Sequence, residues 1–255
     1  MSASLQQTIL RLDSIDSTNL EAIRQARNGA PEGLCIIARE QTAGRGRLER
    51  SWHSHKDAGI YFSIVLRPGF ETSFWPLLTL MTALAVVDAL LKSCSVRADI
   101  KWPNDIYVNE RKLCGILAET TDTPSGPAAV IGIGINLTND SLPAEVLTTA
   151  TSIEDVTGQS VDQETVLTEL IKAITERYEA LQTAGGREHT IREWCAHSTY
   201  AFDRQVRVSF NSDSFVGITR GLDGDGALRV ETADGKLRVV RAGDVTALRA
   251  YGDEK

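Results

Sequence analysis

From about residue 202 onward, the chain changes from mixed helical and strand patterns to short alternating runs separated by turns. Val206, Val208 and Phe210 form one such run, and similar runs follow at 215–218, 228–230 and 237–239. Turn signals separate them at 211–213, 223–226 and 234–235, where the last two contain Asp-Gly pairs that favour tight hairpins. We therefore expect a small β-barrel at residues 199–255, appended to a larger mixed domain at residues 1–198.

The larger domain alternates helix and strand signals. Strands are expected at 34–38, 60–66 and 130–135, and a polar turn between 106–108 and 113–118 indicates a hairpin. Apolar residues keep helical spacing from Val166 to Leu181. These patterns predict a mixed domain of helices and strands.

The most apolar stretch, residues 75–91, is shorter than the roughly 20 apolar residues that span a bilayer. It also contains Thr79, Thr82 and Asp88, so we interpret it as a buried helix.

The charge balance excludes several classes of partner. Lys and Arg number 27 against 34 Asp and Glu, which gives a net charge of −7. This balance argues against general binding to nucleic acids or anionic membranes. The N-terminus lacks a secretory signal, and the four cysteines form neither a CxxC pair nor a disulfide framework. We expect a reduced, cytoplasmic protein. The four histidines show no metal-ligand pattern, so the sequence leaves any metal site unknown.

A glycine- and arginine-rich segment is the first candidate for anion binding. Arg45, Arg47 and Arg50 are interleaved with Gly44 and Gly46. Guanidinium groups match phosphate oxygens, and glycines let backbone amides approach an anion. A solvated basic loop is the alternative interpretation of this segment taken alone.

Two lysines could act on a substrate. Lys101 opens the segment Lys-Trp-Pro-Asn-Asp at residues 101–105, of which a structural turn explains only the last three residues. Lys112 begins the second strand of the expected hairpin. If its side chain points into a cleft, its charge could neutralise a carboxylate and a phosphate together. A solvated surface lysine is the alternative.

The run Ile-Gly-Ile-Gly-Ile-Asn at residues 131–136 places its isoleucines on one strand face and Gly132, Gly134 and Asn136 on the other. Glycine inside a strand often marks the close approach of a ligand or another backbone. The bare face could hold a flat base whose edge Asn136 reads. A tightly packed helix or strand on that face remains an equal alternative.

Six segments occur in an order that closely resembles biotin protein ligases, also called biotin–[acetyl-CoA-carboxylase] ligases. They are STN at 17–19, QTAGRGR at 41–47, RSW at 50–52, KWPND at 101–105, RKLCGIL at 111–117 and GIN at 134–136. Each segment is modest alone, and the ordered set is specific. The resemblance extends from about Asp13 to the C-terminus.

The resemblance implies a fold and an activity. The implied fold is α+β, with a mixed, mainly antiparallel sheet and flanking helices like class II aminoacyl-tRNA synthetase cores, followed by an SH3-like β-barrel. The implied ligase converts biotin and Mg-ATP into biotinyl-5′-adenylate and pyrophosphate. A specific lysine of the biotin carboxyl carrier protein of acetyl-CoA carboxylase then attacks the adenylate and releases AMP. The cofactor set is biotin (as substrate), ATP and Mg²⁺.

Some family members carry an N-terminal winged helix that represses transcription. Only a short segment precedes the first motif here, so we expect a monofunctional ligase. We also expect no nucleic-acid or membrane partner, and a monomer or homodimer.

The resemblance assigns roles to residues at matching positions. Lys112 and Arg47 are the implied catalytic residues. The implied biotin-binding residues are Ser17, Thr18, Asn19, Gln41, Gly44, Arg45, Gly46, Arg47, Lys112 and Gly115. The implied ATP-binding residues are Arg45, Arg47, Arg50, Trp52, Lys101, Asn104 and Asn136. Thr18 with Glu21 also fits a helix-capping box, so a cap is the alternative role for the segment at 17–19.

Two features depart from simple expectation. Glu49 replaces the third glycine of the family's GRGRxGR pattern, which would cost about 1–2 kcal/mol if that position is left-handed. Strict alternation also places Lys112 and Gly115 on opposite faces of their strand. If both line the biotin site, the strand contains a bulge or Gly115 contributes through its backbone.

Two other functions remain as alternatives. One is a related acyl ligase of similar core fold, such as a lipoate ligase. The other is a regulator that binds biotin or nucleotide without turnover.

Overall fold

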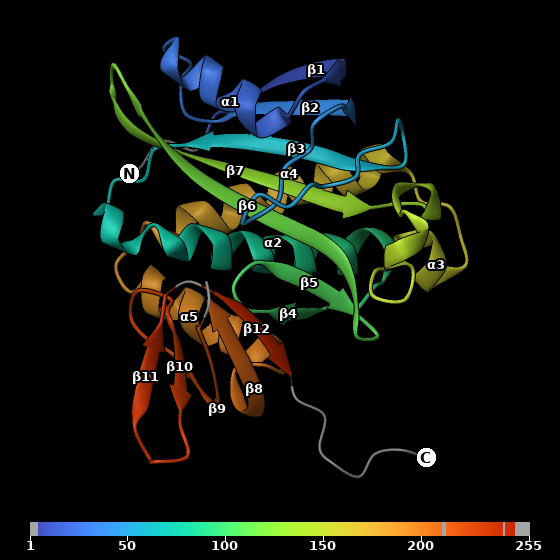
Figure 1. The fold of residues 1–255 in the computed structure, drawn as a ribbon. Coiled ribbons are helices and arrows are strands. Elements are labelled where there is room, and N and C mark those ends of the chain that lie inside the picture. The colour runs from blue at the N-terminus through green and yellow to red at the C-terminus, as the bar shows by residue number, and fades with distance from the viewer. Residues whose placement is uncertain (1–4, 211–212, 242, 248–255) are drawn as a thin grey trace.

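The structure is a computed structural model that describes residues 5–210, 213–241 and 243–247 (Figure 1). Two β-sheets organise it. Along the chain the elements are β1 (Thr8–Ile15), α1 (Thr18–Arg27), β2 (Leu34–Gln41), β3 (Gly59–Leu66), η1 (Thr72–Phe74), α2 (Pro76–Cys94), β4 (Asp99–Lys101), β5 (Asp105–Val108), β6 (Arg111–Thr123), β7 (Gly126–Asn136), η2 (Asn139–Ser141), η3 (Ala144–Val146), α3 (Ile153–Thr157), α4 (Gln163–Leu181), α5 (Gly186–His197), β8 (Phe202–Phe210), β9 (Asp213–Leu222), β10 (Leu228–Glu231), β11 (Leu237–Val240) and β12 (Asp244–Ala247).

The larger sheet has seven strands in the order β1-β2-β3-β7-β6-β5-β4. Strands β1 and β2 are parallel, and every other neighbouring pair is antiparallel. The α+β class with a mixed, mainly antiparallel sheet is therefore confirmed. Strand β3 is buried along its whole length, as a strand covered on both faces must be.

Helices cover both faces of this sheet (Figure 1). Helices α2, α4 and α5 pack together against one face and share the main hydrophobic core with it. Helix α1 covers the other face above a small cluster that includes Ala22, Ala26 and Ile36. Successive side chains along β2, β3 and β7 therefore point alternately into the main core and into the smaller cluster.

Helix α2 is long and apolar enough to cross a membrane by length and composition, but 67% of its most apolar window is buried inside the structure. Side chains such as Leu77, Met81 and Leu84 are buried in the main core. Each contributes about 1.5–3 kcal/mol through removal from water. The prediction of a buried core helix is confirmed.

The smaller sheet has five strands in the order β11-β10-β9-β8-β12 and forms an SH3-like C-terminal β-domain. It lies against α2 and the turn at 101–105. The buried Trp102 donates a hydrogen bond from Nε1 to the carbonyl of Gly226 at 3.0 Å. A Cβ on Gly226 would lie 2.9 Å from Leu80 Cδ1, and its φ is +84°, so glycine is required at this contact. Of the expected turn at 211–213, residues 211 and 212 lie outside the described residues, as do the chain ends at 1–4 and 248–255.

Helix α1 begins without the predicted capping box. Its N-cap is Ser17, whose side chain makes no capping hydrogen bond, and Thr18 is the first helical residue. Thr18 Oγ1 instead lies 3.1 Å from Gln41 Oε1, while Glu21 pairs with Arg24. The prediction of a capping box was wrong because tertiary partners, Gln41 on β2 and Ser63 on β3, take up the Thr18 side chain.

Strand β6 contains a bulge. Tyr107 on β5 is the register partner of Lys112, and Ile106 is the partner of Cys114, so Leu113 is an extra residue. The bulge turns Lys112 and Gly115 toward the same side of the sheet: a Cβ on Gly115 would lie 3.3 Å from Lys112 Cε. Of the two possibilities raised by the sequence, the structure shows the bulge.

Candidate functional site

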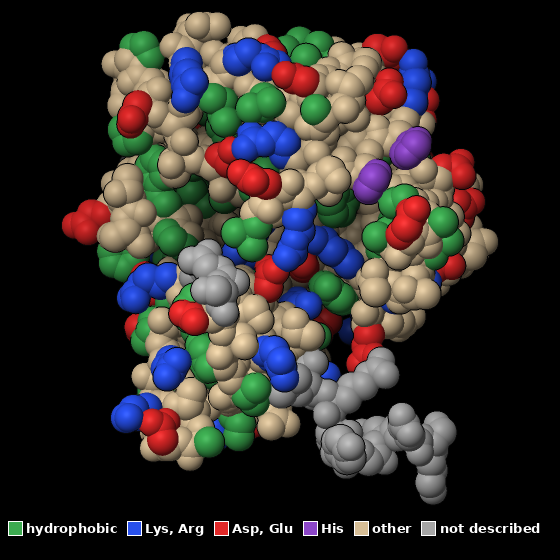
Figure 2. Space-filling view, viewed as in Figure 1, with side chains coloured by type: hydrophobic (Ala, Val, Ile, Leu, Met, Phe, Trp, Pro, Cys, Tyr) green, Lys and Arg blue, Asp and Glu red, His purple; other side chains and the backbone are tan. Residues whose placement is uncertain are grey.

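A cavity of about 280 Å³ lies over the centre of the larger sheet. In Figure 2, basic and acidic side chains gather at a hollow between the main body and the C-terminal domain. The expected site residues that line the cavity are Ser17, Thr18, Asn19, Gln41, Arg45, Gly46, Arg47, Arg50, Trp52, Asn104, Lys112, Gly115 and Asn136. Gly44 and Lys101 are not among its lining residues.

The glycine face expected from the sequence forms the base of the cavity. Gly115 on β6 and Gly134 on β7 are register partners. A Cβ on Gly134 would lie 2.4 Å from Trp52 Cε2, and one on Gly115 would lie 2.9 Å from Trp52 Cζ3. The two glycines therefore admit the Trp52 indole, which rests directly on the strand backbones. Trp52 Nε1 is buried and has no hydrogen-bond partner among the described residues, which leaves a donor at the base of the cavity.

A polar network closes one end of the cavity. Gln41 Oε1 accepts a hydrogen bond from the backbone N–H of Thr18 at 2.8 Å, and Gln41 Nε2 donates to Ser54 Oγ at 2.8 Å. Asn19 is buried, and its Oδ1 accepts a hydrogen bond from Ser63 Oγ at 2.6 Å. Buried polar groups that are already oriented by such bonds can present fixed donors and acceptors to a polar ligand. Ser63 was missed by the sequence reasoning, although a serine in a fully buried apolar strand was a usable signal.

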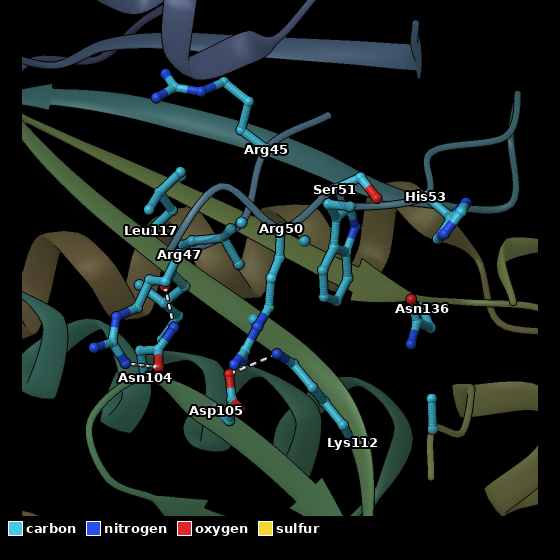
Figure 3. A pocket seen from close by; sticks show the side chains of 18 of the residues that line it. Arg45, Arg47, Arg50, Ser51, His53, Asn104, Asp105, Lys112, Leu117 and Asn136 are labelled. Carbon is cyan, nitrogen blue, oxygen red and sulfur yellow. Dashed lines mark hydrogen bonds and ion pairs between the residues drawn. The ribbon is translucent and has the colours of Figure 1, made fainter. Parts of the chain in front are cut away.

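Three cations of the site are paired with acids. Lys112 Nζ lies 2.7 Å from Asp105 Oδ1, Arg50 pairs with Asp244 of β12, and Arg45 lies 3.0 Å from Glu119 Oε1. Figure 3 shows Lys112 pointing toward Asp105, with their ion pair as a dashed line. Asp105 Oδ1 is buried and accepts no aligned hydrogen bond from the described residues, so its contact with Lys112 is an ion pair only.

Arg47 differs from the other cations. Its guanidinium donates to Asn104 Oδ1 at 3.0 Å and to the Gly243 carbonyl at 3.3 Å, and it forms no ion pair with an acid in the described part of the chain. Burial lowers the pKa of Arg47, and the negative charges of Asp244 and Asp105 oppose this shift. A half-buried guanidinium with only neutral partners is suited to receive an anion.

Lys101 lies beside the cavity instead of inside it. Its Nζ is 3.4 Å from Tyr107 Oη and 4.9 Å from the centre of the Tyr107 ring. Burial lowers the pKa of Lys101, and the charge of Asp105 opposes that shift. The structure therefore places Lys101 behind Tyr107, which itself lines the cavity.

The loop from Gly44 to Trp52 covers the cavity, and its two arms pair in antiparallel fashion. Arg45 and Ser51 form a β-bridge, and the N–H of Trp52 donates to the Gly44 carbonyl at 2.9 Å. A Cβ on Gly44 would lie 2.3 Å from the Trp52 carbonyl oxygen, so only glycine allows this approach. At the tip Glu49 has a φ of +60°, which is the left-handed geometry considered from the sequence.

The segment after β7 forms the opposite wall. Leu142, Pro143 and Val146 line the cavity there and supply an apolar surface that the sequence reasoning missed. Asn136 Nδ2 donates to the Thr151 carbonyl at 3.0 Å, which ties the end of β7 to this wall. The backbone of Lys112 is tied to it as well, since its N–H donates to the Thr149 carbonyl at 2.8 Å.

The acidic partners were also missed. Asp105 belongs to the recognised segment at 101–105, and this position could have indicated that it lies at the site. Glu119 and Asp244 gave none, because only tertiary packing brings them to Arg45 and Arg50.

Comparisons with known proteins agree with this geometry. Residues 11–136 match the Biotin/lipoate A/B protein ligase family, and residues 201–246 match the biotin protein ligase C terminal domain. The chain is 35% identical to the bifunctional ligase/repressor BirA of Bacillus spizizenii over 239 residues, covering 92% of this chain and 73% of BirA. It is 35% identical to the biotin–[acetyl-CoA-carboxylase] ligase of Paracoccus denitrificans over 237 residues, covering 90% of this chain and 96% of that protein.

A solved structure supports the same relationship. The biotin protein ligase from Aquifex aeolicus in complex with biotin and ATP superposes with a TM-score of 0.81 at 28% identity, covering 96% of this chain and 100% of that one. The ordered motifs, the two-sheet fold and these similarities lead to one assignment: this chain belongs to the biotin protein ligase family.

Proposed function

We propose that this protein is an ATP-dependent biotin ligase that forms biotinyl-5′-adenylate and transfers biotin to a lysine of a biotin carboxyl carrier protein. One observation carries the proposal. A single cavity joins the polar end at Asn19 and Gln41, the glycine base beneath Trp52, and the cations Arg47 and Lys112. This combination of groups suits a ligand that has a polar head, a carboxylate and a phosphate.

Charge neutralisation is the main chemical demand of the first step. The biotin carboxylate must attack an α-phosphate that is also anionic, so positive groups must offset their repulsion. We assign this role to Lys112 and Arg47, and each charge-assisted hydrogen bond would contribute about 1.5–3 kcal/mol. Holding both reactants in line supplies up to about 7–11 kcal/mol more. The reaction requires no nucleophilic side chain from the protein.

The remaining residues divide between the two ends of the cavity. For the biotin end we propose Ser17, Thr18, Asn19, Gln41, Arg45, Gly46 and Gly115, with Gly44 acting through the backbone turn that it permits. For the nucleotide end we propose Arg50, Trp52, Asn104 and Asn136 in contact with the ligand, and Lys101 acting through Tyr107. The loop that ends at Trp52 would shield the mixed anhydride from water.

The residues present also fit Mg²⁺. Asp105 has a buried carboxylate oxygen without an aligned hydrogen bond, and Asp244 adds a second carboxylate to the cavity lining. Mg²⁺ prefers oxygen ligands and is typically held by one or two carboxylates together with substrate phosphates. When bound with ATP, the ion would offset part of the phosphate charge.

A lipoate-type ligase is the less favoured alternative. The first family match includes both biotin and lipoate ligases, but the match at residues 201–246 is to the C-terminal domain of biotin protein ligases. By the name of its Paracoccus denitrificans relative, we infer that the acceptor is the carrier protein of acetyl-CoA carboxylase. We further propose that the protein acts in the cytoplasm without a nucleic-acid partner, as a monomer or homodimer.

The direct test is mass spectrometry of a purified biotin carboxyl carrier domain after incubation with this protein, biotin and Mg-ATP. We expect one biotin adduct on one lysine, and none when ATP is omitted. A parallel assay follows biotin-dependent exchange of pyrophosphate into ATP. Exchange without an adduct would mean that the carrier is mismatched. Absence of both, with biotin still bound, would refute the ligase and support a regulator without turnover.

A further inference from the structure

Glu119 on β6 does not line the cavity, yet its carboxylate holds two residues that do. Oε2 of Glu119 accepts hydrogen bonds from Asn19 Nδ2 at 3.0 Å and from Arg45 Nη1 at 3.1 Å. Oε1 lies 3.0 Å from Arg45 Nη2, so the ion pair is bidentate. The Glu119 side chain is 21% exposed and that of Arg45 is 40% exposed. One carboxylate therefore joins the floor of the cavity to the loop that covers it.

Asn19 forms the floor side of this connection. Its amide lies across β7 at Gly132, where a Cβ would come within 2.1 Å of Asn19 Oδ1. The register partners of Gly132 are Ser63 on β3 and Leu117 on β6, and Asn19 bonds to both: its Oδ1 accepts from Ser63 Oγ, and its Nδ2 donates to the Leu117 carbonyl at 3.2 Å. Glu119 receives the second Nδ2 proton, which fixes the amide orientation completely.

Arg45 forms the loop side. Figure 3 shows its guanidinium turned away from Arg47, Asp105 and Lys112. Because both of its terminal nitrogens bond to Glu119, its charge is used within the protein instead of facing a phosphate. Arg45 is also the residue that pairs with Ser51 at the base of the covering loop. This arrangement differs from the sequence-based expectation that Arg45 neutralises substrate phosphate.

We infer that Glu119 is a positioning residue that couples the biotin-side floor to closure of the Gly44–Trp52 loop. It acts through Asn19 and Arg45 and touches neither substrate. A ligand that fixes Asn19 thereby favours the Glu119 position that holds Arg45, and a closed loop in turn favours the Asn19 orientation that receives biotin. The inference rests on the proposed function, because it specifies how the same cavity retains its adenylate.

The decisive variant is Glu119→Gln, which keeps the size of the side chain but removes its charge and one of its two acceptor oxygens. We expect KM for biotin to rise about tenfold and release of biotinyl-5′-adenylate to accelerate about tenfold, while kcat for adenylation changes less than threefold. A residue that only stabilises the fold would lower the thermal midpoint without this split. The matched control is Glu164→Gln, which removes a bidentate ion pair with Arg11 at 2.6 Å on the surface. It should keep wild-type values.

A second variant keeps the test valid if Glu119→Gln folds poorly. Arg45→Lys retains the charge but cannot form the bidentate ion pair. It should therefore reproduce the faster release of adenylate with Asn19 unchanged. Coupling also predicts that the double variant is no worse than Glu119→Gln alone. The inference would be overturned if Glu119→Gln released the adenylate as slowly as the wild-type protein. It would also be overturned if the effects of the two substitutions on release multiplied in the double variant.

Trypsin cleavage after Arg47 and Arg50 gives a readout that does not depend on catalysis. We expect biotin to protect the loop in the wild-type protein and in Glu164→Gln, and to protect it several-fold less in Glu119→Gln. If the wild-type protein forms no adenylate but this difference persists, the ligase proposal fails and the coupling stands. If adenylate forms normally and protection is equal in all three proteins, the coupling fails and the ligase proposal stands.

Discussion

The ammonium group of Lys112 lies 2.7 Å from Oδ1 of Asp105, and it lies 5.5 Å from the centre of the Trp52 ring. The bulge at Leu113 makes this position possible, since an unbroken strand would turn Lys112 away from the face that Gly115 occupies. The bulge therefore places the cation on the cavity side of the sheet, where Asp105 pairs with it and where we propose that it neutralises a carboxylate and a phosphate.

Replacing Lys112 by Ala is expected to slow adenylate formation about 10- to 150-fold, because one charge-assisted contact of about 1.5–3 kcal/mol is lost from the transition state. The thermal midpoint should fall far less than the rate, although the substitution leaves Asp105 without its cation. Pyrophosphate exchange and thermal unfolding, measured side by side, check this. Lys56→Ala is the control, since its partner Asp13 lies at 2.8 Å on the surface. Equal losses of rate and stability would identify Lys112 as a structural lysine.

Replacing Arg47 by Ala is expected to accelerate release of the adenylate at least tenfold at nearly unchanged stability. Among the described residues the guanidinium bonds only to Asn104 and the Gly243 carbonyl, so its removal leaves none of their acids unpaired. The measurement is the dissociation rate of preformed adenylate. Arg241→Ala, which breaks a surface pair with Asp225 at 2.8 Å, serves as the control. An unchanged release rate would contradict the assignment of Arg47.

Gly134→Ala tests the contact between the glycine face and Trp52. The new Cβ would lie 2.4 Å from the indole, which is too close for any unstrained contact, so the ring must move off the strand. We expect a shift in tryptophan fluorescence and at least tenfold weaker binding of biotin and ATP. Gly224→Ala is the control because no atom lies within 4 Å of the added Cβ. Wild-type fluorescence and affinity in Gly134→Ala would show that the ring can share the site.

Glu49→Gly tests the left-handed loop tip. With φ at +60°, Glu49 carries a backbone strain of about 1–2 kcal/mol that glycine would remove. We expect loop closure and ATP affinity to be unchanged or improved. Glu49→Ala separates the two causes, since it removes the charge and keeps the strain. Tighter ATP binding in both variants would identify the charge of Glu49 as the cause. Tighter binding in the glycine variant alone would identify the backbone strain as the cause. Clearly weaker binding in both would show that the carboxylate has a positive role.

The sequence by itself determined the fold class and most of the cavity. Alternation in the run at 131–136 fixed a bare glycine face, and helical spacing from Val166 to Leu181 fixed a buried stripe on α4. The ordered segments contained most of the polar residues that line the cavity, but not its apolar wall at Leu142, Pro143 and Val146. Such features are local: side-chain period and residue type decide which face is apolar, and this information is complete within a few residues.

Tertiary structure alone decided how the charges are paired. Glu119 meets Arg45 across 74 positions, and Asp244 meets Arg50 across 194. It also decided that Lys112 and Gly115 share a face, and that Thr18 bonds to Gln41 instead of capping its helix. Ion pairs and buried hydrogen bonds need distances set by packing of distant strands. No local sequence pattern determines those distances, so they are set only when the two sheets and the C-terminal domain assemble.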